Sequence, residues 1–180
     1  MNLVFFDTDD GFPYGDCVYL DNLSAIGQLL ESTDEAFEND VYVGWDKLDI
    51  ANVRKREDAF RSLKPAGQVI HVPWRRDRQI PKAELEAVLA QLPELNKTML
   101  LCGTGEIGQQ LAEILWDRGT VPGKMAVVDA FEGAGKYPVS IYEQNLKEMA
   151  KLIFEQLKKQ VRAGSLWQAE RIAVAGIYKE

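Results

Sequence analysis

Hydrophobic residues in this chain gather in short apolar runs that alternate with longer stretches of helical spacing. The runs have the length of β-strands. Their apolar character is continuous rather than alternating, so we expect a parallel sheet that is covered on both faces. The predicted strands are Leu3–Phe6, Val41–Trp45, Val69–Val72, Met99–Cys102, Met125–Val128 and Ile172–Ile177.

Between these runs, apolar residues recur every three or four positions, which predicts amphipathic helices. The pattern is clearest in the last helix, where Leu146, Met149 and Ile153 alternate with lysines and glutamates. Gly119 and Gly164 follow their helices as stop signals. The predicted helices are Leu23–Glu31, Ile50–Leu63, Lys82–Leu92, Glu106–Arg118 and Asn145–Val161.

Six strands with five crossovers predict one α/β domain over residues 1–180, with a doubly wound, Rossmann-like parallel sheet. Two βαβαβ halves with right-handed crossovers favour the strand order 3-2-1-4-5-6. In that order residues 3–6 and 99–102 are adjacent strands at the centre of the sheet. Ligands bind beyond the carboxyl ends of such strands, so we expect a crevice between loop 7–16 and loop 103–108.

The composition is that of a globular chain, with 46% hydrophobic and 27% charged residues. The net charge of −7 is concentrated in the first 50 residues, which argues against a broad basic face and therefore against a nucleic-acid partner. No apolar run is long enough to cross a membrane. The two cysteines, Cys17 and Cys102, are too few for a disulfide framework and point to a cytoplasmic location.

A glycine motif follows the fourth predicted strand. Gly103, Gly105 and Gly108 have G-x-G-x-x-G spacing, with Thr104 between the first two, and a helical pattern follows. Asp129 ends the next apolar run, close to the position of a ribose-binding carboxylate. A helix start in this setting can bind a phosphate through its free N–H groups. The alternative is a tight turn in which Gly108 only packs the helix on the sheet.

Residues 98–129 resemble the dinucleotide-binding domains of NAD(P)-dependent enzymes. The resemblance implies that Gly103, Thr104, Gly105 and Gly108 form a phosphate loop and that Asp129 binds the ribose. It also implies NAD or another nucleotide as cofactor. One departure is the position of the motif, which follows the first strand in those enzymes and the fourth predicted strand here.

The acidic loop after the first predicted strand has three interpretations. Asp7-Thr8-Asp9 resembles the opening motif of haloacid-dehalogenase-type phosphohydrolases, which implies a nucleophile at Asp7, an acid/base at Asp9 and bound magnesium. That family's later acidic pair is not found. Independently of any family, Asp7, Asp9 and Asp10 could hold a hard divalent cation. The third interpretation is a solvated acidic turn.

A further resemblance, to isochorismatase-like cysteine hydrolases, spans more of the chain. It is carried by the opening strand with Asp7 and Phe12, and by Asp129-Ala130 after the fifth predicted strand. It implies that Asp7 is the catalytic acid. The family's nucleophilic cysteine falls on or near Gly108, which has no side chain, so the resemblance implies that this activity is lost.

Cys102 and His71 are weaker candidates. Cys102-Gly103-Thr104-Gly105 resembles the start of a rhodanese or tyrosine-phosphatase loop, but no arginine follows to bind the oxyanion. We therefore expect a buried, unreactive Cys102. His71 ends a strand, no carboxylate partner can be assigned to it, and we expect a structural or surface role.

Our main hypothesis is a protein that binds a nucleotide or dinucleotide between residues 7–16 and 103–108. One alternative is a hydrolase that uses Asp7 with Asp9 or Asp10. The other is a non-catalytic sensor or assembly subunit whose ligand changes its association. Whether the chain is an enzyme, and whether it forms a homo-oligomer, stay open at this point.

Overall fold

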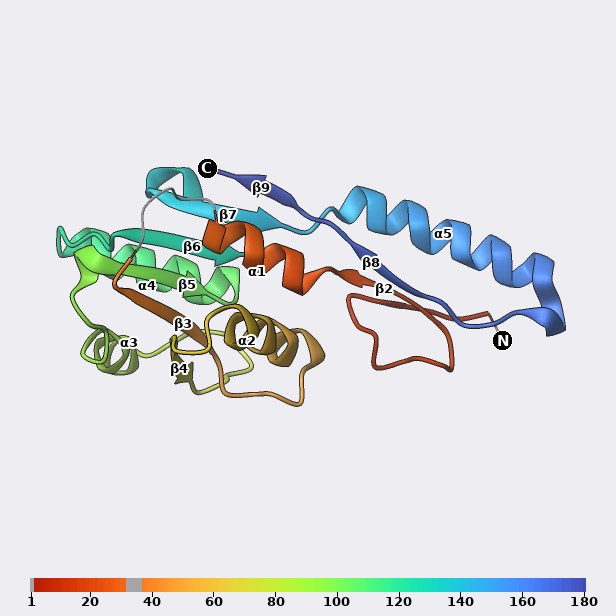
Figure 1. Ribbon diagram of the computed structural model, residues 1–180, viewed down its shortest axis with the longest axis horizontal. Helices are drawn as coiled ribbons and strands as arrows, with labels where there is room; N and C mark the ends of the chain where they lie inside the picture. The colour runs from red at the N-terminus through yellow and green to blue at the C-terminus, as the bar shows by residue number, and fades with distance from the viewer. Residues whose placement is uncertain (1, 32–36) are drawn as a thin grey trace.

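The computed structural model describes residues 2–31 and 37–180, which form two β-sheets lying end to end (Figure 1). The larger sheet has six strands, and five of them are parallel. The last strand runs antiparallel to its neighbour at one edge. The order across the sheet is β4 (Gln68–Val72), β3 (Asn39–Trp45), β5 (Thr98–Cys102), β6 (Lys124–Val128), β7 (Val139–Glu143) and β9 (Ile177–Lys179).

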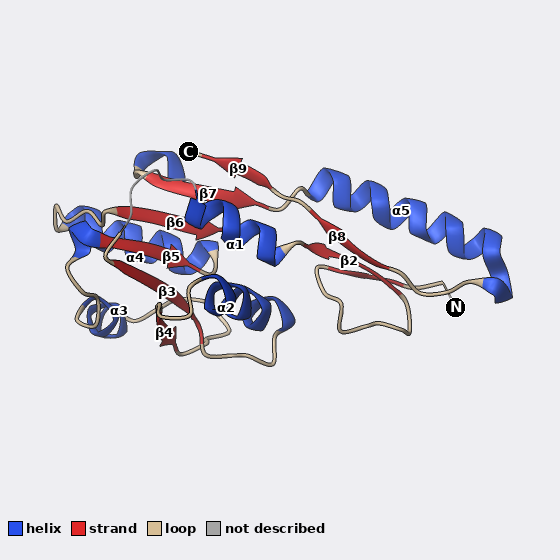
Figure 2. Ribbon diagram, in the orientation of Figure 1, coloured by secondary structure: helices blue, strands red, loops and turns tan. Residues whose placement is uncertain are grey.

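Helices cover both faces of this sheet (Figure 2). We call the six-stranded sheet and these helices the large lobe. On one face, α1 (Asn22–Glu31) and α2 (Ala51–Leu63) bury a cluster that includes Tyr42, Phe60 and Leu101. On the other, α3 (Lys82–Leu89) and α4 (Gly105–Asp117) bury a second cluster. Short 3-10 turns, η1 (Leu95–Lys97) and η2 (Ala134–Lys136), precede β5 and β7.

The smaller sheet and one long helix form the small lobe. Its parallel strands have the order β1 (Val4–Phe6), β2 (Asp16–Leu20) and β8 (Arg171–Val174). The helix α5 (Leu146–Ala163), followed by η3 (Gly164–Leu166), packs on this sheet. Apolar residues at helical spacing make the contact, because Met149 meets Val18 and Val174 in a buried cluster. Of the described residues, no helix is long and apolar enough to cross a membrane.

The chain passes between the lobes three times, at Asp21, at residues 144–145 and at residues 175–176. The three crossings are neighbours. The backbone N–H of Asp21 donates to the carbonyl of Val174 at 2.9 Å, and the N–H of Gly176 donates to the hydroxyl of Tyr142 at 2.9 Å. A side chain at Gly176 would collide with the backbone of Glu143, so only glycine fits there.

The structure confirms an α/β fold with a parallel sheet wound on both faces, but not the predicted strand order. The strand β5 lies between β3 and β6, and β1 belongs to the other sheet. Residues 3–6 and 99–102 are therefore not adjacent. The reason is that β1 pairs with β2, a strand within the region that we interpreted as a loop and its continuation. The predicted strand Ile172–Ile177 divides at the third crossing into β8 and β9.

Candidate functional site

A cavity of about 260 Å³ lies at the carboxyl ends of the large-lobe strands, next to the small lobe. In parallel α/β sheets this is the edge where ligands bind, because the loops that follow the strands converge there. Side chains from both lobes and from the crossing after β7 line it. They are Asp7, Trp45, Ile50, Asn52, Val53, Arg56, Trp74, Arg78, Thr104, Gly105, Glu106, Asp129, Ala130 and Gln144.

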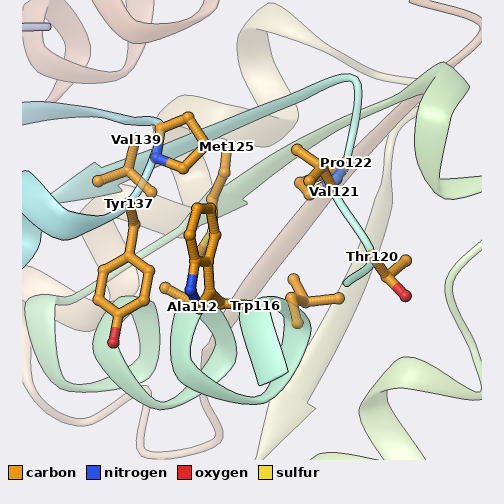
Figure 3. Close-up of a pocket in the computed structure, with 10 residues that line it drawn as sticks. Ala112, Trp116, Thr120, Val121, Pro122, Met125, Tyr137 and Val139 are labelled. Carbon is orange, nitrogen blue, oxygen red and sulfur yellow. The ribbon is translucent and has the colours of Figure 1, made fainter. Parts of the chain in front are cut away.

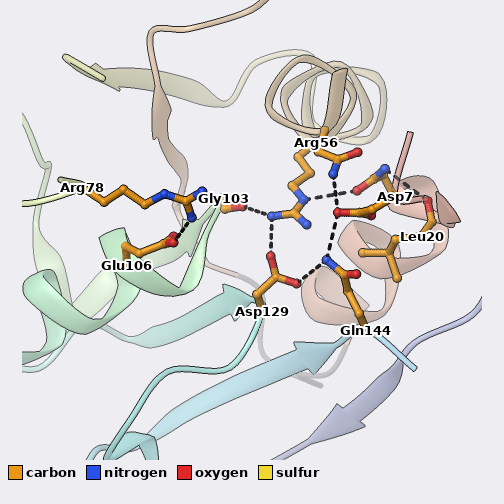
Figure 4. Close-up of polar contacts among 10 residues, drawn as sticks. Asp7, Leu20, Arg56, Arg78, Gly103, Glu106, Asp129 and Gln144 are labelled. Carbon is orange, nitrogen blue, oxygen red and sulfur yellow. Dashed lines mark hydrogen bonds and ion pairs between the residues drawn. The ribbon is translucent and has the colours of Figure 1, made fainter. Parts of the chain in front are cut away.

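Arg56 is the buried cation of this site (Figure 4). It is 3% exposed, and its position on α2 directs the guanidinium toward the ends of β5 and β6. Its Nη1 atom lies 2.8 Å from the carbonyl oxygen of Gly103 and 2.8 Å from a carboxylate oxygen of Asp129. The Nε–H donates to Asn22 at 3.2 Å. A buried charge is tolerated when it is paired and hydrogen-bonded in this way.

Two aspartates enter the site from strained backbone positions. Asp7 follows β1 with φ of 53°, and Asp129 follows β6 with φ of 71°. Non-glycine residues with positive φ are uncommon, and aspartate is among the types that tolerate it. Such strain often accompanies functional sites. Here it marks the two strand ends that bring carboxylates from different lobes to one cavity.

Gln144 joins these two carboxylates. Its side-chain amide donates to Asp7 at 3.3 Å and to Asp129 at 3.2 Å, as Figure 4 shows. On the large-lobe side, the amide of Asn52 donates to the same oxygen of Asp7 at 2.5 Å. The second carboxylate oxygen of Asp7 is buried and has no hydrogen-bond partner among the described residues. The sequence analysis named neither Gln144 nor Asn52, because nothing in their local spacing marks them.

The electrostatic state of Asp7 reflects these surroundings. Burial and the negative charge of Asp129 raise the pKa of Asp7 above its ordinary value of 3.8. The charge of Arg56 and the hydrogen bonds from Gln144 and Asn52 oppose this shift without cancelling it. Asp7 thus holds its proton to a higher pH than a solvated aspartate does.

The remaining wall of the cavity combines aromatic and charged groups. Trp45 ends β3 and is almost fully buried, while Trp74 is half-buried with the ammonium of Lys47 5.5 Å from its ring centre. Arg78 and Glu106 form an ion pair that is partly exposed. Burial by itself would raise the pKa of Glu106, but the hydrogen bond from Arg78 holds it below its ordinary value.

The predicted glycine loop is only partly at the cavity. Thr104, Gly105 and Asp129 line it, as does Asp7 from the acidic loop. Gly103 contributes its carbonyl to Arg56. A Cβ atom on Gly105 would lie 2.7 Å from the carbonyl oxygen of Ala130.

Gly108 is not at the cavity but on the sheet. A Cβ atom there would lie 2.5 Å from the side chain of Val127. The glycines thus allow α4 to approach β6 closely, as the packing alternative expected.

The acidic loop does not gather its carboxylates around one point. Asp7 faces the cavity, Asp9 pairs with Lys55, and Asp10 pairs with Arg54 at 3.4 Å. Over residues 2–31 and 37–180 no group of three or more His, Cys, Asp or Glu side chains could hold a metal ion. This arrangement gives no support to the expected metal site at Asp7, Asp9 and Asp10, nor to a catalytic Asp7–Asp9 pair.

The two weaker candidates have structural surroundings. Cys102 and Cys17 are both fully buried, and burial raises the pKa of each thiol, which makes it less reactive. His71 has a carboxylate partner after all, since its Nε2 lies 2.7 Å from Glu57. That pair lies on α2 and β4, outside the cavity.

A second, apolar pocket lies beside the carboxyl end of α4 (Figure 3). Trp116 and Tyr137 form one wall, with ring centres 6.0 Å apart in an edge-on arrangement. Its volume of about 20 Å³ is roughly that of one water molecule. This pocket is too small for an organic ligand, and the interlobe cavity is the better candidate.

No protein-family model matches the chain, and no curated protein matches it. Solved structures do. A trehalose repressor from Escherichia coli superposes with a TM-score of 0.72 at 18% identity, covering 98% of this chain and 68% of its own. A LacI-family regulator from Enterococcus faecalis with bound ribose gives 0.73 at 15%, covering 98% and 66%. A xylose-binding transcription activator gives 0.77 at 17%, covering 100% and 52%.

These structures correct the resemblances drawn from the sequence. The structures that match are transcriptional regulators and not NAD(P)-dependent enzymes or isochorismatase-like hydrolases, so the nucleotide-binding and hydrolase hypotheses are wrong. The prediction of NAD and magnesium as cofactors is wrong for the same reason. A physical reason is visible at the start of α4, where Glu106 and Asp129 line the cavity and would place two carboxylates beside a bound pyrophosphate.

The chain spans about two thirds of the first two structures and about half of the third. Identities below 20% identify a shared fold and nothing finer. In fold, the chain is similar to transcriptional regulators of the LacI type.

Proposed function

We propose that this chain is a non-catalytic sensor that binds a small, uncharged, polyhydroxylated molecule, such as a monosaccharide, in the interlobe cavity. The observation that carries the proposal is the composition of that cavity. Carboxylate, amide and guanidinium groups converge there from both lobes, beside two tryptophans.

The chemistry of the cavity fits such a ligand. A sugar hydroxyl donates to a carboxylate and accepts from an amide or guanidinium, and these groups stand close together at Asp129, Asn52 and Arg56. The C–H faces of a sugar ring are apolar and pack on aromatic rings, here Trp45 and Trp74. A volume of about 260 Å³ is at the small end of ligand pockets, which favours a monosaccharide over a larger molecule.

The charges disfavour an anionic ligand. Arg56 and Arg78 are already paired with Asp129 and Glu106, while Asp7 adds a further carboxylate. Among the residues that line the cavity, no unpaired cation is left to offset the negative charge that a phosphate would meet. Two similar structures, a regulator with bound ribose and a xylose-binding activator, support a sugar.

A sensor is favoured over an enzyme because the ligand would touch both lobes at once. Asp7 belongs to the small lobe, and Arg56 and Asp129 belong to the large lobe. A molecule that binds both changes the equilibrium between arrangements of the lobes, which another part of a regulator can read. This agrees with the sensor alternative of the sequence analysis.

The test is thermal unfolding and calorimetry with ribose, xylose, glucose, trehalose and glucose 6-phosphate. A sugar at 100 times its dissociation constant stabilises the folded chain by about 2.7 kcal/mol, which raises the melting temperature by roughly 5–10 °C. We expect this shift with an uncharged sugar and a smaller one with the phosphate.

Trp74→Ala should weaken binding at least about tenfold, which corresponds to roughly 1.4 kcal/mol. Trp116→Ala, which removes a tryptophan outside the cavity, should leave the affinity unchanged. The proposal is contradicted if none of these sugars stabilises the chain, or if the chain converts a bound sugar into a product.

A further inference from the structure

The acidic loop, whose carboxylates do not gather around one point, makes a series of contacts across the lobes. Asp7, Asp9 and Asp10 follow β1 of the small lobe, and each meets a side chain of the first turns of α2. Asn52 donates to Asp7 at 2.5 Å, Lys55 pairs with Asp9, and Arg54 lies 3.4 Å from Asp10. The six residues belong to two short segments, 7–10 and 52–55, so the contacts form one continuous seam.

Lys55 contacts two residues of the small lobe in this seam. Its ammonium pairs with Asp9 and also lies 4.8 Å from the ring centre of Tyr19, which is on β2 of the small lobe. The side chains of Lys55 and Asp9 are 25% and 17% exposed. Partly buried pairs are screened less by salt than exposed ones. By contrast, the side chains of Arg54 and Asp10 are 41% and 53% exposed.

The seam is separated in sequence from the three crossings. Asp7 belongs to the seam and also lines the cavity. At the crossings the chain is continuous, and the backbone N–H of Asp21 donates to the carbonyl of Val174. The seam, in contrast, is built from side chains that can separate. Its contacts therefore decide how closely the lobes approach on this side.

We propose that residues 7–10 form an electrostatic strap that docks on residues 52–55 of α2 and holds the two lobes together before any ligand binds. The strap consists of the Lys55–Asp9 and Arg54–Asp10 ion pairs with the Asn52–Asp7 hydrogen bond. Because Asp7 also lines the cavity, the strap sets the opening of the ligand site. That last link rests on the proposed function, whereas the strap itself does not.

The strap can be tested without ligand by the distance between spin labels on the two lobes. Asp117 on α4 and Glu155 on α5 are exposed and accept cysteine labels, while Cys17 and Cys102 are buried and stay unlabelled. In the labelled protein without further substitutions we expect one narrow distribution of interlobe distances. Lys55→Glu should place two negative charges opposite each other and shift the distribution to longer distances.

The charge swap that combines Lys55→Glu with Asp9→Lys should restore the original distance. Lys82→Glu, which makes the same charge change at an exposed position of α3, should leave it unaltered. If Lys55→Glu folds poorly, the labelled protein without this substitution can be measured at two salt concentrations instead. Raising the salt from about 0.05 M to about 1 M shortens the Debye length to about 3 Å, which weakens the ion pairs and should partly lengthen the interlobe distance.

An unchanged distance in Lys55→Glu and at high salt overturns the strap. Lengthening that the swap does not reverse overturns it as well, because the ion pair would then not be the cause. Since no sugar is present, a failure of sugar binding in the calorimetric experiment leaves these outcomes unaffected, and the two proposals can fail separately.

Discussion

The guanidinium of Arg56 lies 2.8 Å from the carboxylate of Asp129, although the two residues belong to different layers of the large lobe. The pair joins α2 to the end of β6. Through Gln144, which donates to Asp129 at 3.2 Å, it extends to the crossing that leads into α5. The centre of the site is thus a fixed polar network rather than a set of free side chains.

Replacing Arg56 should therefore be costly. Arg56→Met leaves Asp129 and the carbonyl of Gly103 without their partner in a partly buried site. Breaking a buried pair from one side costs about 3–5 kcal/mol, and we expect a loss of this order in urea unfolding. Arg54→Met removes an exposed pair on the same helix and should cost about 1 kcal/mol or less. Equal losses for both variants would contradict the structural role of Arg56.

Gly105 should resist substitution even by alanine. The Cβ atom would lie 2.7 Å from the carbonyl oxygen of Ala130, so α4 must move away from the loop after β6. Such overpacking costs about 1–3 kcal/mol, measurable as a lower denaturation midpoint. Gly135→Ala is the matched control, because nothing lies within 4 Å of the added atom. An unchanged denaturation midpoint in Gly105→Ala would show that the start of α4 accommodates the added atom without moving.

The raised pKa of Asp7 makes a prediction about pH. Burial, reinforced by Asp129, holds the proton on folded Asp7 above its ordinary pKa of 3.8. As the pH rises from 3.8, the unfolded chain loses this proton first, so the free energy of unfolding falls until the raised pKa is passed. Asp7→Asn stays neutral, and asparagine also tolerates the positive φ of 53°.

The advantage of Asp7→Asn over wild type should therefore grow as the pH rises through this window. The measurement is the melting temperature of both proteins at a series of pH values. Asp117→Asn, at an exposed position, provides the reference for a lost surface carboxylate. If the two melting curves shift in parallel with pH, Asp7 has the same pKa in the folded and unfolded chains.

We also predict that residues 1–180 unfold as one domain. Three crossings and the contacts of residues 7–10 with α2 join the lobes, and the small sheet takes its third strand, β8, from a segment that follows β7 of the large lobe. Calorimetry should give one transition whose calorimetric and van't Hoff enthalpies agree. Two resolved transitions, one of them sensitive to substitutions in α5, would instead make the lobes separate domains.

Much of the large lobe was predictable, because its elements carry strong local signals. The predicted helix Ile50–Leu63 corresponds to α2, and the predicted strand Met99–Cys102 to β5. β7 was missed. Only the short turn η2 separates it from β6, whereas the alternation of strands and helices led us to expect a full helix between parallel neighbours. Its five residues include a serine, which interrupts the apolar run.

The separate sheet of the small lobe was not predicted, for a different reason, although β1, β8 and α5 correspond to predicted elements. The strands β1 and β8 both pair with β2, which was missed, and about 150 residues separate β2 from β8 in sequence. Long-range pairing leaves no trace in local periodicity. The same holds for the site, where Asp7 and Asp129 were predicted from strand ends but Gln144 was not. A glutamine after a strand becomes significant only when the crossing places it between two carboxylates.

The division of the small lobe between the two ends of the chain has a consequence for synthesis on the ribosome. β1 and β2 emerge first, yet their sheet needs β8, which begins at Arg171. At about 5–20 residues per second, the N-terminal strands wait roughly 8–30 seconds for this partner. Within that interval the large lobe can assemble all but its edge strand β9. The small lobe therefore completes its sheet only after most of the large lobe has been synthesised, once β8 has left the exit tunnel.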